Sequence, residues 1–179
     1  MILLTFNIIN HHLQFRKNEQ ISDEENLKIT ENNVSSILRI LENHHVLTSF
    51  FIEISLVEKL KPLIKKIVSK GHEIALYNDN SEIAEIETVK RNTEDFIEKI
   101  IRGIRQKEVT ISVNELKNLE FSYISNIENA NILFPFKRLK RSTEIFEENG
   151  VNIIPESISP YPQIPYNDFV FQVVPLKFY

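Results

Sequence analysis

The chain has 179 residues, of which 42% are hydrophobic and 26% are charged, and its formal net charge is −4. This balance is typical of a soluble globular protein, and we expect one domain over residues 1–179. The slightly negative charge argues against binding to nucleic acid. The absence of cysteine excludes disulfides, thiolate catalysis and cysteine-based zinc sites.

The apolar segments are all shorter than the roughly 20 residues that cross a bilayer, so we expect no membrane insertion. The opening segment Met1–Phe6 is short and has no basic flank, which makes it a poor signal peptide. It is more typical of a buried strand. These features, together with the lack of cysteine, predict a cytoplasmic protein.

The first half of the chain alternates between two kinds of pattern. Short runs of β-branched and aromatic residues predict strands, and apolar residues at three- and four-residue steps predict helices. The expected strands are 2–9, 46–54 and 73–77. The expected helices are 30–43, 55–70 and 82–101, with a polar loop over 18–26 and Gly71 ending the second helix.

Shorter elements are expected in the second half. Strands are predicted at 109–112, 121–125, 132–136 and 151–154, and helices at 113–119 and 137–149. Gly150 is expected to end the last helix, and the proline-rich and aromatic segment from Pro155 onward is expected to be coil. Strands that alternate with helices indicate a parallel sheet or a barrel.

Five sequence blocks, in order and with preserved spacing, resemble the polysaccharide deacetylases of the NodB homology family (carbohydrate esterase family four). The blocks are ILLTFN, ILRILENHHVLTSFFI, IVSKGHEIALYN, Gly103-Ile104-Arg105 and IIPESISPYPQIP. The resemblance implies an α/β fold, namely a distorted, incomplete (β/α) barrel. It also implies metal-assisted hydrolysis of the amide of N-acetylated sugars, in which the metal activates water. One aspartate acts as the base, a second aspartate and two histidines hold the metal, and a late histidine donates a proton.

The residues that match these functional positions are different in this chain. The base aspartate falls on Asn7 and the metal-binding aspartate on Ile8, or on Ile9 or Asn10 in another register. The two metal-binding histidines fall on Tyr77 and Ser81, and the late histidine on Gln172. The arginine that orients the base is retained as Arg105. We therefore expect no bound metal and no deacetylation.

Four of the residues at or near these positions are candidates for binding a ligand: Asn7, Asn10, Tyr77 and Arg105. Arg105 could hold an anion or a sugar hydroxyl, or it could pair with a carboxylate such as Asp79 or Glu73. A zinc or other divalent ion would require a rearranged site, for which His11 and His12 are the alternative ligands.

Three functions remain open on this basis. The first is an inactive deacetylase-like protein of carbohydrate metabolism that binds a glycan, a glycan precursor or a protein partner. The second is an active metal-dependent N-deacetylase with a rearranged site that uses His11 or His12, Asp79 and Arg105. The third is an interaction module, for example a homodimer formed through the aromatic residues of the C-terminal segment.

Overall fold

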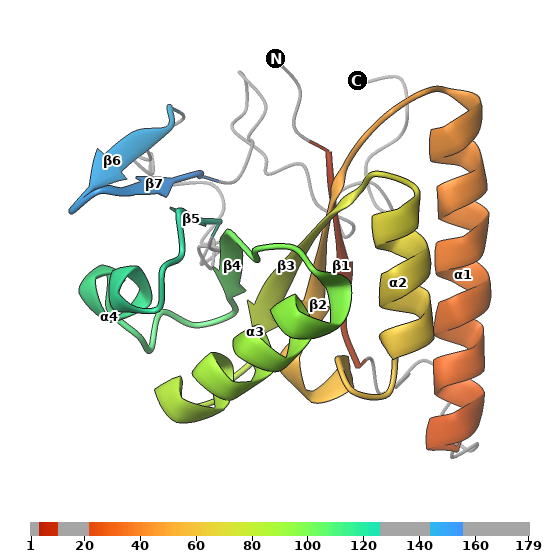
Figure 1. Cartoon of the computed structure of the whole chain (residues 1–179), viewed down its shortest axis with the longest axis horizontal. Helices are drawn as coiled ribbons and strands as arrows, with labels where there is room; N and C mark the ends of the chain where they lie inside the picture. The colour runs from red at the N-terminus through yellow and green to blue at the C-terminus, as the bar shows by residue number, and fades with distance from the viewer. Residues whose placement is uncertain (1–3, 11–21, 126–143, 156–179) are drawn as a thin grey trace, which may run out of the picture.

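A computed structural model describes residues 4–10, 22–125 and 144–155 of the chain. These residues form a seven-stranded sheet with the order β1-β2-β3-β4-β5-β7-β6. Neighbouring strands are parallel from β1 to β7, and β6 pairs antiparallel to β7. Figure 1 shows the sheet extending from β1, which lies beside α1 and α2, to the β6–β7 hairpin at the opposite end. The expected α/β fold is confirmed, as a sheet that is open within the described residues, which is an incomplete barrel.

The elements follow one another in a β/α alternation. The strands are β1 (Thr5–Ile8), β2 (Ser49–Glu53), β3 (Glu73–Asn78), β4 (Gly103–Gln106), β5 (Tyr123–Ile124), β6 (Phe146–Glu148) and β7 (Val151–Ile153). The helices are α1 (Asp23–Asn43), the 3-10 turn η1 (Ile54–Leu56), α2 (Lys61–Ser69), α3 (Ile83–Ile97) and α4 (Val113–Asn118). Parallel neighbours joined through helices are the pattern that builds (β/α) barrels.

One face of the sheet packs against the helices. Alternate strand residues such as Ile8, Ile52 and Leu76 point to this face, because successive side chains of a strand point to opposite sides. They form a single core with the inward stripes of the helices, which include Leu38, Ile64, Ile86 and Leu116. Burial of this apolar surface is the main stabilising term of the fold.

The other face carries the side chains at the intervening positions. A small cluster of Phe51, Ala75 and Tyr77 is buried there, with Ile9 and Tyr123 packed against it. The polar side chains of β1 to β4 on this inner face are Thr5, Asn7, Ser49, Glu53, Glu73 and Arg105. The polar and aromatic inner face holds the candidate site.

Several predicted elements differ from the observed ones in the first half of the chain. The helix expected from Thr30 begins at Asp23, within the expected loop, because Ser22 caps it by accepting a hydrogen bond from the Glu25 amide at 3.2 Å. The helix expected over 55–70 is divided into η1 and α2, and Pro62 lies in the first turn of α2. The helix expected to reach Ile101 ends at Ile97, because Glu98 adopts a left-handed conformation with φ of 54°.

Other differences lie in the second half. The strand expected at 109–112 is wrong, because the strand in this part of the chain is β4, Gly103–Gln106. The Gln106 side chain instead binds the backbone of Ile111 through two hydrogen bonds of 3.1 Å. The helix expected over 137–149 is wrong for 146–148, which form β6, and Gly150 lies in the hairpin turn with φ of +85°. Two of the expected elements lie wholly outside the described residues, namely the strand at 132–136 and the coil after Pro155. Residues 137–143 of the expected helix also lie outside them.

Candidate functional site

The carboxyl ends of β1 to β4 bring four inner-face side chains together. In the sheet register Asn7 is opposite Phe51, while Glu53 pairs with Tyr77 and Tyr77 pairs with Arg105. Carboxyl ends of parallel strands are where barrel enzymes place their functional groups. We call this group, Asn7, Glu53, Tyr77 and Arg105, the carboxyl-end cluster.

Arg105 connects strands that are not neighbours in the sheet. Its Nη1 donates to Asn7 Oδ1 at 2.6 Å, and its Nη2 donates to Thr5 Oγ1 at 3.2 Å. Its Nε donates to the carbonyl oxygen of Ser125 at 2.8 Å, and Nη2 also donates to Ser125 Oγ at 2.8 Å. The guanidinium lies over the Phe51 ring at 3.9 Å from the centroid, a cation–π contact. Arg105 thus ties β4 and β5 to β1 across the inner face.

Tyr77 combines a buried ring with an accessible hydroxyl. The residue is only 5% exposed, and its ring packs with Phe51 and Ala75. Its hydroxyl makes no hydrogen bond with another described residue. Among the described residues, the one side-chain polar atom that is both fully buried and without a partner is His72 Nδ1. The Tyr77 hydroxyl oxygen is therefore not fully buried. The pKa of Tyr77 is raised, mainly by burial and then by the charge of Asp79. The hydroxyl therefore stays protonated at neutral pH.

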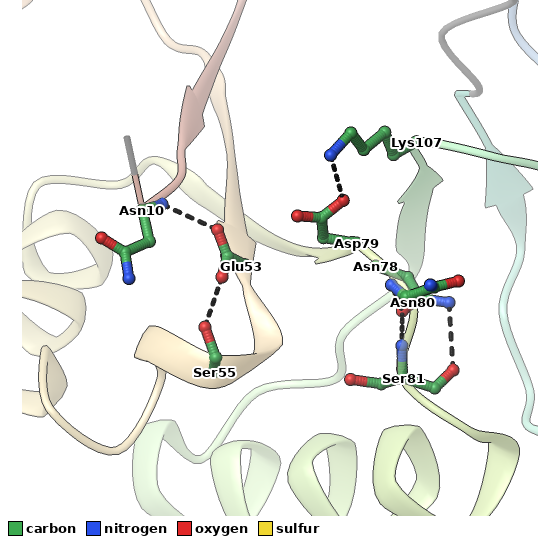
Figure 2. A network of polar contacts seen from close by, with 8 residues as sticks. All are labelled: Asn10, Glu53, Ser55, Asn78, Asp79, Asn80, Ser81 and Lys107. Carbon is green, nitrogen blue, oxygen red and sulfur yellow. Dashed lines mark hydrogen bonds and ion pairs between the residues drawn. The ribbon is translucent and has the colours of Figure 1, made fainter. Parts of the chain in front are cut away.

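Glu53 is an acidic side chain at this site that the sequence comparison did not identify. It is only 9% exposed. Its Oε2 accepts a hydrogen bond from the backbone N–H of Asn10 at 2.7 Å, and its Oε1 accepts one from the Ser55 hydroxyl, as Figure 2 shows. The two-residue period of the strand could have revealed it. Glu53 follows Ser49 and Phe51 at two-residue steps, so its side chain lies on the same inner face as theirs.

The loop after β3 is held by Asn78, which is 2% exposed. Asn78 Oδ1 accepts from the amides of Asn80 and Ser81 at 3.0 and 2.6 Å. Beside them Asp79 forms an ion pair of 2.7 Å with Lys107 (Figure 2). This pair raises the pKa of Lys107, mainly through its hydrogen bond to Asp79. The Asp79 carboxylate, expected as a partner of Arg105, is bound to Lys107.

A second polar group lies deeper on the inner face, at the amino ends of the strands. Ser49 Oγ donates to Glu73 Oε2, and the Tyr123 hydroxyl hydrogen-bonds to this pair. Burial raises the pKa of Tyr123 well above its ordinary value, followed by the charge of Glu73. Tyr123 fits because Gly103 has no side chain: a Cβ there would lie 2.1 Å from Tyr123 Cζ. We interpret this group as structural.

The positions that match the family's metal ligands do not suit a divalent ion. Ile8, in the place of the metal aspartate, is 4% exposed and belongs to the core on the helix face, so it does not face the carboxyl-end cluster. Tyr77 and Ser81 offer neutral hydroxyl oxygens, whereas zinc prefers thiolate, imidazole and carboxylate ligands. The described residues contain no group of three or more histidine, aspartate or glutamate side chains arranged to hold a metal.

An open hollow lies beside this site, at the loop after β3. It has a volume of about 430 Å³ and is lined by residues of the loop after β3, the first turn of α3 and the segment before α4: Asn80, Ser81, Glu82, Ile83, Ala84, Thr110 and Ile111. On the inner face the ring of Tyr77 packs with Phe51 and Ala75, while Leu76 points to the helices.

The four predicted ligand-binding candidates lie at one end of the sheet. Asn7 and Arg105 are hydrogen-bonded, and Tyr77 is next to Arg105 in the register. The backbone N–H of Asn10 donates to Glu53, which pairs with Tyr77 in the register. Ser81 lies in the neighbouring loop. His11, His12 and Gln172 lie outside the described residues.

Comparison with solved structures identifies the fold. A CE4 family pseudoenzyme from Bacillus anthracis is 18% identical, with a TM-score of 0.51 over 69% of this chain and 42% of that chain. A candidate polysaccharide deacetylase from Mycobacterium smegmatis is 19% identical, with a TM-score of 0.52 over 69% and 45% of the two chains. An allantoinase is 13% identical, with a TM-score of 0.58 over 86% and 60%. The chain thus has the polysaccharide deacetylase fold, as the sequence resemblance predicted.

The chain spans less than half the length of the Bacillus anthracis and Mycobacterium smegmatis proteins. No protein-family model and no curated protein matches the sequence. Among the described helices, none has the length and apolar character needed to span a bilayer.

Proposed function

We propose that this protein binds a glycan at the carboxyl-end cluster and does not deacetylate it. The observation that carries the proposal is the contact between Asn7 and Arg105. Asn7, which matches the family's base in the sequence resemblance, accepts a hydrogen bond from the guanidinium through its amide oxygen at 2.6 Å. An amide does not take up a proton near neutral pH, so Asn7 cannot act as a general base.

The side chains at the positions of the metal ligands also support the loss of metal-dependent hydrolysis. The chemistry of this family depends on an ion that activates water, and the ligands of such an ion must be anionic or imidazole groups. Tyr77 and Ser81 are neutral, and Ile8 lies in the core. The chain's own residues can still bind and orient a polyhydroxyl ligand through Tyr77, Glu53 and the edge of the adjoining hollow.

One of the fold neighbours supports this proposal. This neighbour, from Bacillus anthracis, is itself a CE4 family pseudoenzyme, so in that protein the fold persists without the family activity. Fold likeness alone does not fix a function. The proposal therefore depends on the residues of the carboxyl-end cluster.

The competing functions give different outcomes in one experiment. The purified protein is incubated with the β-1,4-linked tetramer of N-acetylglucosamine, with and without added zinc, and acetate release and binding are both measured. Binding without acetate release is the expected result. Zinc-dependent acetate release would instead support a rearranged active site, and the absence of binding together with concentration-dependent dimerisation would support an interaction module.

A further inference from the structure

We propose that the hollow between the loop after β3 and the segment before α4 is a docking groove for a basic peptide segment of a protein partner, which inserts one aliphatic side chain. The inference goes beyond the glycan-binding function proposed above and does not depend on it. The groove offers an apolar lining to the aliphatic side chain, and carboxylates around it attract the basic ones.

Two buried amide side chains hold the walls of the hollow in place. Asn78 and Gln106 are paired in the register of β3 and β4, and they are 2% and 1% exposed. Asn78 binds the backbone of Asn80 and Ser81 on one wall (Figure 2), and Gln106 binds the backbone of Ile111 on the other. Because these hydrogen bonds form without a ligand, both walls are already ordered, and a partner that binds there loses less free energy to ordering them.

The lining of the hollow suits an aliphatic side chain. Ile83 and Ala84 contribute from the first turn of α3, and Ile111 contributes from the segment before α4. Ile111 is 5% exposed and belongs to the main core, and Ile83 packs against the same core. An apolar side chain that enters the hollow therefore leaves water and contacts the edge of the core, which is favourable.

The charges around the hollow favour a basic partner. Residues 79–85 and 107–115, the two stretches that contain the lining residues, carry five carboxylates: Asp79, Glu82, Glu85, Glu108 and Glu115. Lys107 is the only basic residue of these stretches, and it forms the 2.7 Å ion pair with Asp79. The two stretches alone thus have as much net negative charge as the whole chain. Lysine or arginine side chains of a bound peptide would complement this charge.

Other occupants fit this surface less well. In a symmetric dimer a second copy would bring the same acidic stretches to the contact, and nucleic acid or an anionic membrane would be repelled. A metal ion is not favoured, since the part of the chain that the structure describes has no group of three or more histidine, aspartate or glutamate side chains arranged to hold one. A cationic peptide is attracted by the same charges and can also bury an aliphatic side chain.

The test is a fluorescence anisotropy titration of the protein with a fluorescein-labelled peptide of sequence Lys-Lys-Leu-Lys-Lys. In one control peptide serine replaces the leucine, and in another glutamate replaces the four lysines. We expect the leucine peptide to bind and the serine peptide to bind about tenfold more weakly, because burial of the leucine side chain is lost. The glutamate peptide should not bind, and added salt should weaken binding of the leucine peptide, because salt screens exposed charges.

Three variants locate the binding. Ala84→Phe fills the hollow from an exposed position, so it should weaken binding of the leucine peptide about tenfold and leave the urea unfolding midpoint unchanged. Glu82→Lys reverses a charge of the lining and should weaken binding about fivefold. Glu24→Lys is the matched control, because Glu24 is an exposed acidic residue in the first turn of α1, and this variant should bind as the unaltered protein does.

Four results would overturn the proposal. Absence of binding of the leucine peptide to the unaltered protein contradicts it outright. Equal affinity for the leucine and serine peptides, or for the leucine peptide with and without Ala84→Phe, shows that the hollow takes no aliphatic side chain. Equal weakening by Glu82→Lys and Glu24→Lys shows that the attraction is not local to the hollow. Self-association that Ala84→Phe abolishes would assign the hollow to a second copy of the chain instead.

Discussion

The Arg105 guanidinium donates a hydrogen bond of 2.6 Å to the side-chain oxygen of Asn7, although β4 and β1 are separated in the sheet by β2 and β3. The contact crosses the inner face above Phe51. It links β1, which carries Asn7, to β4, which carries Arg105.

Replacing Asn7 with aspartate should stabilise the fold and should not create an enzyme. The new carboxylate would accept a charge-assisted hydrogen bond from Arg105, so we expect the free energy of unfolding to rise by about 1 kcal/mol. Arg105 would lower the folded-state pKa of that carboxyl. The gain in stability is therefore complete above the unfolded-state pKa of about 4 and is lost as the pH falls through the lowered folded-state pKa. Urea unfolding at pH 7 and pH 3 measures it, and acetate release by Asn7→Asp would contradict the account.

Replacing Arg105 with methionine should destabilise the protein. The change removes the bonds to Asn7, Thr5 and Ser125 and the charge above Phe51. Because these groups are only partly buried, we expect a loss of about 2–3 kcal/mol. Arg102→Met is the matched control, since Arg102 is exposed and lies on the same segment of the chain. Equal unfolding midpoints for the two variants would show that Arg105 is not a structural link.

Adding a methyl group at Gly103 should be poorly tolerated. A Cβ at this position would lie 2.1 Å from Tyr123 Cζ, which is far closer than any nonbonded contact. We expect Gly103→Ala to lower the free energy of unfolding by about 2 kcal/mol or more, as overpacking does. In a Tyr123→Ala background the same change should cost much less. A double-mutant cycle measures this coupling, and purely additive effects would rule out the contact.

Protonation of His72 should destabilise the fold. His72 is 4% exposed, lies edge-on against the Phe50 ring and has no partner for Nδ1 in the described chain. Burial lowers its pKa, and the nearby Lys70 lowers it further. The unfolded chain then takes up the proton first. The free energy of unfolding is therefore highest above the unfolded-state pKa of about 6.5 and falls as the pH drops toward the lowered folded-state pKa of His72.

Urea unfolding at pH 7.5 and pH 5 tests this effect. In His72→Gln the part of the pH dependence that His72 contributes should be absent. His44→Gln serves as the control because His44 is exposed at the end of α1, and this variant should retain the dependence of the unaltered protein. The same slope in all three proteins would mean that His72 is not the group responsible.

The sequence predicted the β/α alternation and the parallel sheet because long buried runs such as Phe50–Ile52 and periodic helices are strong local signals. The prediction of elements from the sequence failed where a contact with another part of the fold decides the local structure. β4 contains glycine, arginine and glutamine among its four residues and is a strand because it pairs with β3, not because of its composition. The start of α1 depends on the Ser22 cap, which outweighs the polar composition of its first turn.

The candidate site was predicted in part. Asn7, Tyr77 and Arg105 were found through the family resemblance, and the structure brings them together at one end of the sheet. Ile8 was assigned to the site by alignment alone, although the two-residue period of a strand places it opposite Asn7, in the core. Glu53 was missed because it matches no motif, and only the register shows that it lies beside Tyr77.

The most direct test of the central claim is the zinc content of purified, untagged protein after equilibrium dialysis against low zinc, measured by elemental analysis. Asn7, Tyr77 and Ser81 provide neutral ligands, and such a set does not hold a divalent ion against water. We therefore predict zinc far below one ion per chain, with binding of the N-acetylglucosamine tetramer unaffected by a chelator. One tightly held ion per chain, together with chelator-sensitive acetate release, would contradict the account.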